Sequence, residues 1–387
     1  MFSWPHQPIE HEDPRSFVPP FCPWPECSEH HATGGFRFHR DGWYERTGDR
    51  RRVPRFLCLS CDRTCSQQSF SVTYYLKRPE LVPAVAAGLL AGSAHRQLAR
   101  SQGCAPSTVT RLSARLGRHS MLLLAFSVDS LETLDEPIVY DDFESFFFCQ
   151  EFALGMGTPV GQESWFIYGL DYAPHRRGGR RTPAQRARRR RLSPAPRYPY
   201  REALARALDL LTDKIPAGCK LRLITDDHGE YRMAVAAHPA GDRIEHRAYA
   251  NPKRPYKGAP RSAQAIERDR QMFAVDLLHG LLRHSLAHHR RETIAFGRRL
   301  NALLERGFLM TIWRNFVKSR SERRSEVPTP AMAIGLTRAP WSWARVLAQR
   351  LFPSRVRVPE SWMQIYRRQI ITPQVGRNVE HTLAQAF

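Results

Sequence analysis

The segment PIVYDDFESFFF, residues 137–148, combines an apolar run with two adjacent carboxylates, Asp141 and Asp142. A second segment, CKLRLITDDHGEY at residues 219–231, has the same plan and carries Asp226 followed by another Asp. Each apolar run is typical of a buried strand. An Asp-Asp pair at a strand end can simply make a turn. Two such pairs favour a divalent metal site, because Mg²⁺ binds few carboxylates and keeps positions open for phosphate oxygens.

The segments around these acidic strands predict the rest of one domain. Residues 164–172 are expected to form a third strand and residues 243–250 a fourth, while residues 200–215 have the periodicity of a helix. A helix that connects strands of one sheet is typical of a mixed sheet. The sequence therefore predicts an α/β core over residues 135–320.

Two cysteine pairs near the N-terminus predict a metal site of a different kind. Cys22 and Cys27 are separated by four residues, and Cys58 and Cys61 by two. Short loops of this length let two thiolates reach one tetrahedral Zn²⁺ at about 2.3 Å each, so the two pairs together complete a four-sulfur site. The alternative is four buried cysteines without a metal.

The residues between the cysteine pairs predict a small antiparallel sheet. Residues 34–46 alternate in polarity around Asp41-Gly42, which predicts a hairpin turn there, and residues 52–58 are expected to be the third strand. Residues 20–70 thus resemble a zinc ribbon, in which the metal supplies stability that so short a chain cannot obtain from a core. Cys65 is expected to pack, while His30 or His31 is a weaker alternative ligand.

Residues 76–125 predict a helix-turn-helix. Gly103 ends one helix, and Pro106 lies near the start of the next, where its missing N–H costs little. Plain three-helix packing would give a similar pattern. In the DNA-reading interpretation, the second helix would enter the major groove with the side chains of Ser107, Thr108, Thr110, Arg111 and Arg115.

The charge of the chain indicates a polyanionic partner. Of its 387 residues, 59 are Lys or Arg and 37 are Asp or Glu, which gives a net charge of +22 and a pI of about 10.3. A dense basic segment, residues 175–197, is expected to be a mobile loop that grips phosphates without reading sequence, or else a tether. Its expected phosphate contacts are Arg188, Arg189 and Arg190.

The remaining segments complete the expected domain organisation. Residues 1–19 are expected to be flexible, residues 294–317 to form a long amphipathic helix, and residues 328–387 to form short helices that dock on the core. No apolar run has the length of about 18 residues that a membrane span needs, and the N-terminus lacks the layout of a secretion signal. We therefore expect a cytoplasmic protein without a membrane partner.

Three blocks give a more specific resemblance. VYDDFESF (139–146), LITDDHGEY (223–231) and the block beginning HRRETIAF (289–324) are similar to blocks of a bacterial insertion-sequence transposase of the DDE type, with an N-terminal zinc ribbon and helix-turn-helix. The resemblance implies a ribonuclease H-like catalytic core that uses Mg²⁺ or Mn²⁺ to cut and rejoin DNA. By motif position, Asp141 is similar to the first acid of the family and Asp226 to the second.

The third acid stays open at the level of sequence. The spacing found in related elements places Asp276 at the position of the family's Glu, with Arg283 seven residues later. Glu292 lies in the best-matching block, RRETIAF, and Glu267 also echoes the motif. Asp276, Arg283 and His279 share one helical face, which favours a polar face over the site.

The resemblance implies a protein of the bacterial nucleoid that binds double-stranded DNA, both the terminal inverted repeats of its element and the target. It also implies at least a homodimer, because two DNA ends must be held together. Two alternatives remain. One is a catalytically inactive, transposase-derived DNA-binding regulator, and the other is a ribonuclease H-like nuclease that acts on a different substrate.

Overall fold

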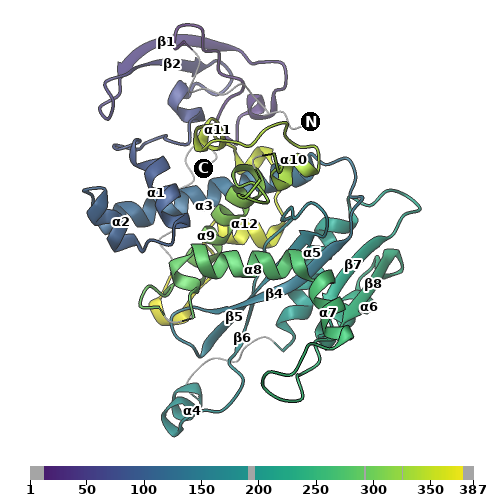
Figure 1. Ribbon diagram of the computed structural model, residues 1–387. Helices are drawn as coiled ribbons and strands as arrows, with labels where there is room; N and C mark the ends of the chain where they lie inside the picture. Colours follow the sequence, from purple (N-terminus) through teal and green to yellow (C-terminus); the bar gives the residue numbers. More distant parts are fainter. Residues whose placement is uncertain (1–12, 191–196, 292, 325, 378–387) are drawn as a thin grey trace.

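The computed structural model describes residues 13–190, 197–291, 293–324 and 326–377. Figure 1 shows a small sheet at one end of the molecule, a layer of helices next to it, and a larger sheet beyond. The small sheet has the order β1-β2-β3, and the larger sheet has five strands in the order β6-β5-β4-β7-β8. None of the described helices is both long and apolar enough to cross a membrane.

The small sheet differs from the expected hairpin in the position of its turn. Strand β1 (Phe38–Glu45) continues through Asp41-Gly42 and pairs antiparallel with β2 (Arg52–Cys58), which in turn pairs with β3 (Thr64–Ser66). The predicted turn is wrong because Gly42, with φ of 74°, lies where the register shifts and forms a bulge. The chain reverses instead over residues 46–51, and residues 52–58 form the second strand rather than the third.

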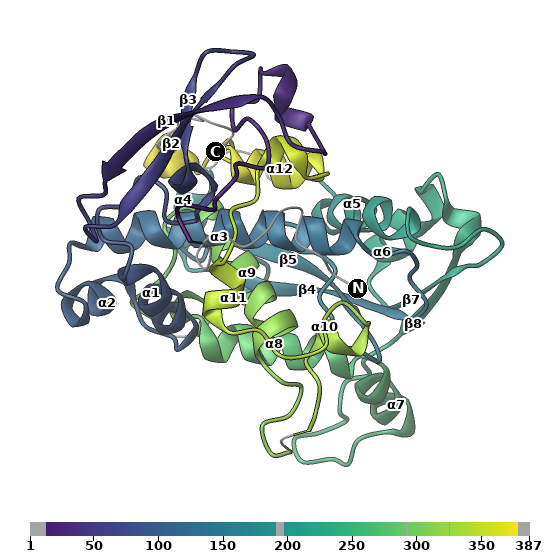
Figure 2. The same cartoon turned by 90° about the horizontal axis from the view of Figure 1, so that it is seen from above.

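Three helices follow at the positions that the sequence indicates. They are α1 (Leu81–Leu90), α2 (His95–Ser101) and α3 (Pro106–Asp129). Gly103 has φ of 56° between α2 and α3, and Pro106 is the first residue of α3. Helix α3 runs 24 residues and crosses the molecule (Figure 2). A side chain at Gly117 would collide with the backbone of Glu305, so this glycine permits the close contact of α3 with α9.

The larger sheet is mixed, as predicted. Strands β4 (Ile138–Phe146), β5 (Phe152–Gly161) and β6 (Ala173–Arg176) are antiparallel neighbours, whereas β7 (Leu221–Asp226) and β8 (Ile244–Tyr249) run parallel to β4. Strands β4, β7 and β8 match the predicted segments. The protein is therefore a mixed α/β protein with a five-stranded sheet and a separate three-stranded sheet.

The strand predicted at residues 164–172 is wrong. These residues run beside β5 and exchange backbone hydrogen bonds with it, for example between Gly157 and Asp171 at 3.0 and 3.1 Å, but they do not form a regular strand. The Asn315 side chain accepts a hydrogen bond from the Ile167 N–H and donates one to the Ile167 carbonyl oxygen, both at 2.9 Å. Trp165 has a left-handed φ of 62°. Side-chain hydrogen bonds and a left-handed residue thus replace a continuous ladder.

Helices cover both faces of the larger sheet. Helices α5 (Pro199–Thr212) and α6 (Gly229–Ala237) pack on one face, while α7 (Ala263–Gln271) and α8 (Phe273–Ser285) lie over the other. The basic segment expected to be a mobile loop contains a short helix, α4 (Pro183–Arg190), and residues 191–196 lie outside the described part of the chain.

The C-terminal third consists of one long helix and several short helices that pack on the core. Helix α9 (Leu300–Ile312) begins six residues later than predicted and continues into a π-helical turn, Trp313–Val317. Short helices follow as expected, and they bury Leu347, Trp362 and Tyr366 in the main core. They are α10 (Pro330–Ala333), α11 (Trp343–Leu347) and α12 (Glu360–Tyr366). Single 3₁₀ turns occur at Ser28–His31, Gln67–Phe70, Gly241–Arg243, Ala287–His289, Pro353–Arg355 and Pro373–Val375.

The C-terminal segment also fixes the small sheet. Phe352 joins a second core cluster of Phe17, Phe21, Phe56, Cys65 and Phe70. His30 Nε2 also lies 2.7 Å from Ser354 Oγ, so residues 352–354 pack against the N-terminal three-stranded sheet and its aromatic core. Of the segment expected to be flexible, residues 1–12 lie outside the described part, but Phe17 is only 1% exposed, so the expectation fails there.

Candidate functional site

The two predicted metal-binding aspartates lie on neighbouring parallel strands. The register of β4 and β7 ends with Tyr140 opposite Thr225, and Asp141 and Asp226 are the next residues on each strand. Residues in register on neighbouring strands point to the same face of a sheet. Strand β7 ends here, whereas β4 continues to Phe146, so both carboxylates lie at an edge where the sheet narrows.

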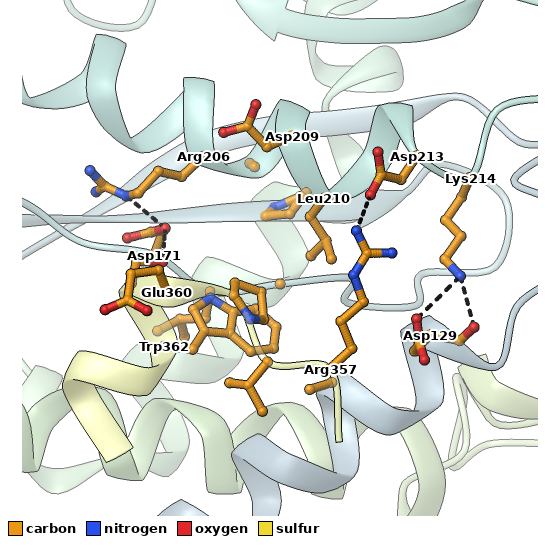
Figure 3. A pocket seen from close by; sticks show the side chains of 18 residues that line it. Asp129, Asp171, Arg206, Asp209, Leu210, Asp213, Lys214, Arg357, Glu360 and Trp362 are labelled. Carbon is orange, nitrogen blue, oxygen red and sulfur yellow. Dashed lines mark hydrogen bonds and ion pairs between the residues drawn. The ribbon is translucent and has the colours of Figure 1, made fainter. Parts of the chain in front are cut away.

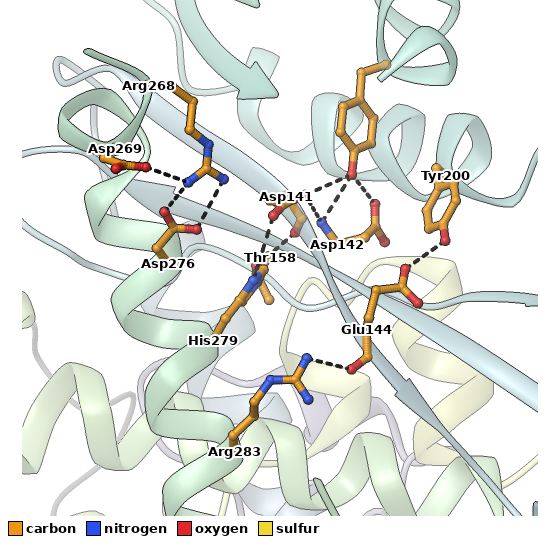
Figure 4. Close-up of polar contacts among 11 residues, drawn as sticks. Asp141, Asp142, Glu144, Thr158, Tyr200, Arg268, Asp269, Asp276, His279 and Arg283 are labelled. Carbon is orange, nitrogen blue, oxygen red and sulfur yellow. Dashed lines mark hydrogen bonds and ion pairs between the residues drawn. The ribbon is translucent and has the colours of Figure 1, made fainter. Parts of the chain in front are cut away.

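Helix α8 places a row of polar side chains over that face (Figure 4). His279 Nδ1 lies 3.8 Å from Asp141 Oδ2, and one turn later Arg283 donates to the Glu144 carbonyl oxygen at 3.1 Å. The Arg283 guanidinium also lies 4.6 Å from the centre of the Phe143 ring. The polar helical face predicted for Asp276, His279 and Arg283 therefore does face the acidic strand.

The electrostatics of Asp141 reflect its acidic neighbours. Burial is the main cause that raises the pKa of Asp141 from its usual 3.8 to about 7, and repulsion from Asp226 and more weakly Asp276 adds to it. The Asp142 backbone N–H and the Arg268 guanidinium act in the opposite direction. The charges of Asp226 and Asp276 thus both act on Asp141, and a cation among the three carboxylates would relieve their repulsion.

Of the three candidates for the third acid, the structure brings Asp276 to this site. Its carboxylate is held by both terminal nitrogens of Arg268, one of them at 3.2 Å. Glu267 lies on α7 and pairs with Arg270 at 3.2 Å and with Gln271 at 2.8 Å. Glu292 lies outside the described residues.

Two residues at this site were not expected from sequence. The Tyr231 hydroxyl donates to Asp142 Oδ2 at 2.9 Å and lies 3.3 Å from Asp141 Oδ1, so it links the two adjacent acids. Asp142 is buried, which raises its pKa well above the usual value, and its Oδ1 atom has no hydrogen-bond partner. Tyr231 does lie within the second acidic segment, but Arg268 carries no sequence signal, because its role depends on how α7 meets α8.

The four predicted cysteine ligands form the second site. The Sγ atoms of Cys22 and Cys61 are 3.8 Å apart, as are those of Cys27 and Cys58, and all four lie within 4.8 Å of one another. Four sulfurs at about 2.3 Å from a tetrahedral zinc would be about 3.8 Å apart. The cluster could therefore hold a metal ion such as zinc. Among the described residues, no other set of three or more such ligands is as compact, and this includes the three aspartates.

The surroundings of the cysteines suit a bound cation. Burial raises the pKa of the Cys22 and Cys61 thiols, whereas the pKa of Cys58 is lowered on balance, because backbone N–H groups of Ser60 and Cys61 outweigh its burial. A cation among the four sulfurs would favour the thiolate form of all of them. His30 is not part of the cluster, because its Nδ1 lies 2.7 Å from the Cys22 carbonyl oxygen. Cys65 packs among aromatic rings as predicted.

The chain matches no family model. A search of curated proteins also finds no significant match. The functions of both sites must therefore be inferred from their own geometry and chemistry.

The residues predicted to contact DNA lie at different depths. Ser107, Thr110 and Arg111 are exposed at the start of α3, and Thr108 is half-buried. Arg115 departs from the expectation, since its guanidinium turns inward and donates to the Val72 carbonyl oxygen at 2.7 Å. Burial lowers its pKa to about 9. Arg115 therefore supports the packing of α3 instead of extending its exposed face.

In the basic segment, Arg190 is exposed, and Arg189 donates to the Arg177 carbonyl oxygen at 3.0 Å. The placement of the Arg188 side chain lies outside the part of the structure that is described. The helix α4 that carries these residues stands away from the body of the molecule (Figure 1), which leaves its arginines open to a large partner.

A groove of about 340 Å³ lies at the end of β4, beyond the acidic site. Glu144 and His175 form part of its wall, and four arginines line it: Arg177, Arg283, Arg290 and Arg291. Arg283 lies one turn of α8 after His279, whose ring faces Asp141. Cationic side chains beside clustered carboxylates are an arrangement that suits a phosphate-bearing substrate and a metal ion together.

A second cavity, of about 280 Å³, lies between α5, the end of α3 and residues 357–362 (Figure 3). Its cationic side chains are paired with carboxylates of its own wall: Arg206 with Asp171 at 2.9 Å, Arg357 with Asp213 at 2.8 Å, and Lys214 with Asp129 at 3.8 Å. None of the predicted site residues lines it. Because these cationic side chains are already paired within the chain, the cavity suits a phosphate-bearing substrate less well than the groove lined by Arg283.

Proposed function

We propose that this protein is a DDE-type transposase that cleaves DNA and transfers the cut strand at the ends of an insertion sequence. The observation that carries the proposal is the position of Asp141 and Asp226 on neighbouring parallel strands, below Asp276 and His279 of α8. Arg283, one turn further along α8, lines a groove that contains three more arginines. The mixed five-stranded sheet with helices on both faces supports a ribonuclease H-like catalytic core.

Asp141, Asp226 and Asp276 would hold Mg²⁺ or Mn²⁺. Their oxygen donors fit hard divalent cations, and the pKa of Asp141 is raised by burial and by repulsion from Asp226, which a bound cation would offset. When bound, such ions activate a water molecule or a 3′-hydroxyl group and stabilise the leaving oxygen of a phosphodiester. The exchange of one phosphodiester for another requires no nucleotide cofactor.

The remaining parts of the chain would bind and orient DNA. Arg283 and the other arginines of the groove would hold the phosphates next to the acids, and Tyr231 would fix the orientation of Asp141 and Asp142 through its hydroxyl. The exposed start of α3, in a helix-turn-helix, would contact the inverted repeats. The four cysteines with their three-stranded sheet would form a zinc ribbon beside it.

A second candidate is a DNA-binding regulator derived from a transposase, with an inactive core. The contact that favours it is the clamp of Arg268 on Asp276, which occupies both carboxylate oxygens of the third acid. Here an Asp also stands where the related elements have a Glu, and its shorter side chain reaches less far toward β4. In this alternative the N-terminal modules would bind DNA and the acids would hold no metal.

Incubation with supercoiled plasmid separates these candidates. In Mg²⁺ or Mn²⁺, the protein should nick plasmid that carries the element's ends, and Asp141→Asn should abolish nicking while DNA binding survives. Asp242→Asn, which changes an exposed carboxylate, is the matched control and should nick normally. Nicking retained by Asp141→Asn would remove this residue from the mechanism. DNA binding without nicking by the unaltered protein would favour the regulator, and preference for an RNA–DNA hybrid would favour the nuclease.

A further inference from the structure

The imidazole ring of His279 is largely buried and contacts two residues of the sheet. The ring is 14% exposed and is held between two partners on the sheet. Nε2 lies 3.0 Å from the Thr158 hydroxyl, and Nδ1 faces Asp141 Oδ2 at 3.8 Å. Thr158 is the residue of β5 directly opposite Asp141, so helix and sheet fix the orientation of the ring together (Figure 4).

The hydrogen bonds around Thr158 determine which ring nitrogen carries a proton. The Thr158 hydroxyl has one proton to donate. Its oxygen lies 3.0 Å from the Asp141 carbonyl oxygen, which can only accept a hydrogen bond. Both contacts of the hydroxyl are satisfied when it donates to that carbonyl and accepts from Nε2–H of His279. The neutral imidazole then has a lone pair on Nδ1, and that lone pair faces the Asp141 carboxylate.

Two acceptors that face each other repel unless a cation or a proton lies between them, and a metal ion can contact both. The separation of 3.8 Å is too long for a direct hydrogen bond between Nδ1 and Oδ2. Donors at about 2.1 Å from one metal ion are about 3.0 Å apart when adjacent in an octahedron and about 4.2 Å apart when opposite. The observed separation lies between these limits, so small rotations of the side chains would let one ion contact both atoms.

We infer that His279 is a ligand, through Nδ1, of the divalent ion that Asp141 binds, and that Thr158 positions it by accepting from Nε2–H. The inference rests on the proposed metal-dependent function and makes it more specific. Imidazole nitrogen suits borderline transition ions, whereas Mg²⁺ prefers oxygen. A mixed imidazole and carboxylate site therefore selects Mn²⁺ over Mg²⁺, and His279 is the residue that sets this preference.

Pulsed electron paramagnetic resonance tests the ligand directly. Protein without a histidine tag, with zinc retained at the cysteines, is loaded with one equivalent of Mn²⁺ and examined for electron spin-echo modulation from a coordinated imidazole nitrogen. We expect nitrogen modulation in the unaltered protein and its loss in His279→Gln. His284→Gln, which changes an exposed histidine on the same helix, should retain the modulation.

Each outcome has a separate meaning. In one outcome, Mn²⁺ binds the unaltered protein without nitrogen modulation, and Asp141→Asn abolishes the binding. This result would overturn the inference and leave the proposed function standing. Failure of Mn²⁺ to bind at all, or binding unaffected by Asp141→Asn, would overturn the proposed function itself. Because the unaltered protein carries the decisive signal, a folding defect in His279→Gln would not prevent the test.

The positioning role of Thr158 has its own comparison. Thr158→Val keeps the shape of the side chain but removes the hydroxyl that orients the imidazole, and we expect Mn²⁺ affinity to fall about tenfold or more, as for other residues that orient metal ligands. Thr158→Ser should restore most of the affinity, and Mg²⁺ affinity should change less in both variants. Equal losses for Mg²⁺ and Mn²⁺ in Thr158→Val would contradict selection through His279.

Discussion

Replacing Asp141 by Asn should stabilise the protein when no divalent ion is present. The Asp141 side chain is 19% exposed and lies near two other carboxylates, so the folded protein without metal holds a charge that the unfolded chain would place in water. Asn has nearly the same shape and no charge. The charge that the proposed metal site needs is thus expected to reduce the stability of the protein without metal, as in other sites that are charged for function.

The size of the effect follows from the pKa of Asp141, which is raised from 3.8 to about 7, mainly by burial and then by Asp226. A difference of about three pH units at about 1.4 kcal/mol each corresponds to about 4 kcal/mol. Because the pKa is higher in the folded state, the favourable contribution is complete below about pH 4 and is lost as the pH rises to 7. Above pH 7 the cost of the charged carboxylate is complete.

Thermal unfolding of the two proteins between pH 4 and pH 8, in buffer free of Mg²⁺ and Mn²⁺, measures this difference. With an unfolding entropy of about 2.1 cal/mol/K per residue, about 4 kcal/mol corresponds to about 5 °C for a chain of this length. We expect the gain in melting temperature of Asp141→Asn over the unaltered protein to grow by this amount from pH 4 to pH 8. Comparison at each pH cancels the titration of the groups that do not interact with Asp141.

A divalent ion should reverse the order. An ion present at 100 times its dissociation constant stabilises the folded protein by about 2.7 kcal/mol, and Asp141→Asn should lose most of this gain. Asp242→Asn should follow the unaltered protein throughout, since its carboxylate is exposed. A melting temperature of Asp141→Asn that does not rise relative to the unaltered protein between pH 4 and pH 8 would refute the reasoning.

Three further substitutions test other parts of the structure. Cys58→Ser should release zinc, as measured by metal analysis, and should make residues 20–70 susceptible to protease. The control Cys65→Ser should keep one equivalent of zinc. Zinc retained in Cys58→Ser would contradict the four-cysteine site. Gly157→Ala should lower the free energy of unfolding by about 1–3 kcal/mol, because the new methyl group would collide with the Tyr140 hydroxyl. Denaturant titration measures this loss, and an unchanged unfolding midpoint would exclude the close contact. Arg111→Ala should weaken DNA binding and reduce the slope of affinity against salt by about one phosphate contact, and an unchanged slope would show that its exposed side chain does not contact phosphate.

The local features of the sites could be predicted from sequence because their signals are local. The spacing of Cys22, Cys27, Cys58 and Cys61 predicted the set that lies together, since the short loop within each pair brings two thiols close. Apolar runs predicted β4 and β7, and with them the strands that carry Asp141 and Asp226. The three N-terminal helices likewise follow from periodicity, Gly103 and Pro106.

Strand β5 could not be found in this way. Its three glycines, Gly155, Gly157 and Gly161, lower its strand propensity, and the reason for them is tertiary. A Cβ atom at Gly155 would lie 2.7 Å from the Tyr200 ring and 2.9 Å from Asp142 Oδ1. The contacts that require glycine come from a neighbouring strand and from α5, which no window of local sequence contains.

The sequence by itself determined which residues carry charge and thiol chemistry, and which strands present the two acids. Only the tertiary structure decided that Asp276 and not Glu267 faces Asp141, and that Arg115 turns inward to the Val72 carbonyl oxygen. Helical periodicity fixes which residues share a face, but the direction of that face depends on how α7, α8 and α3 pack. That packing is set by contacts between segments more than 40 residues apart in the chain, so it leaves no pattern in the local sequence.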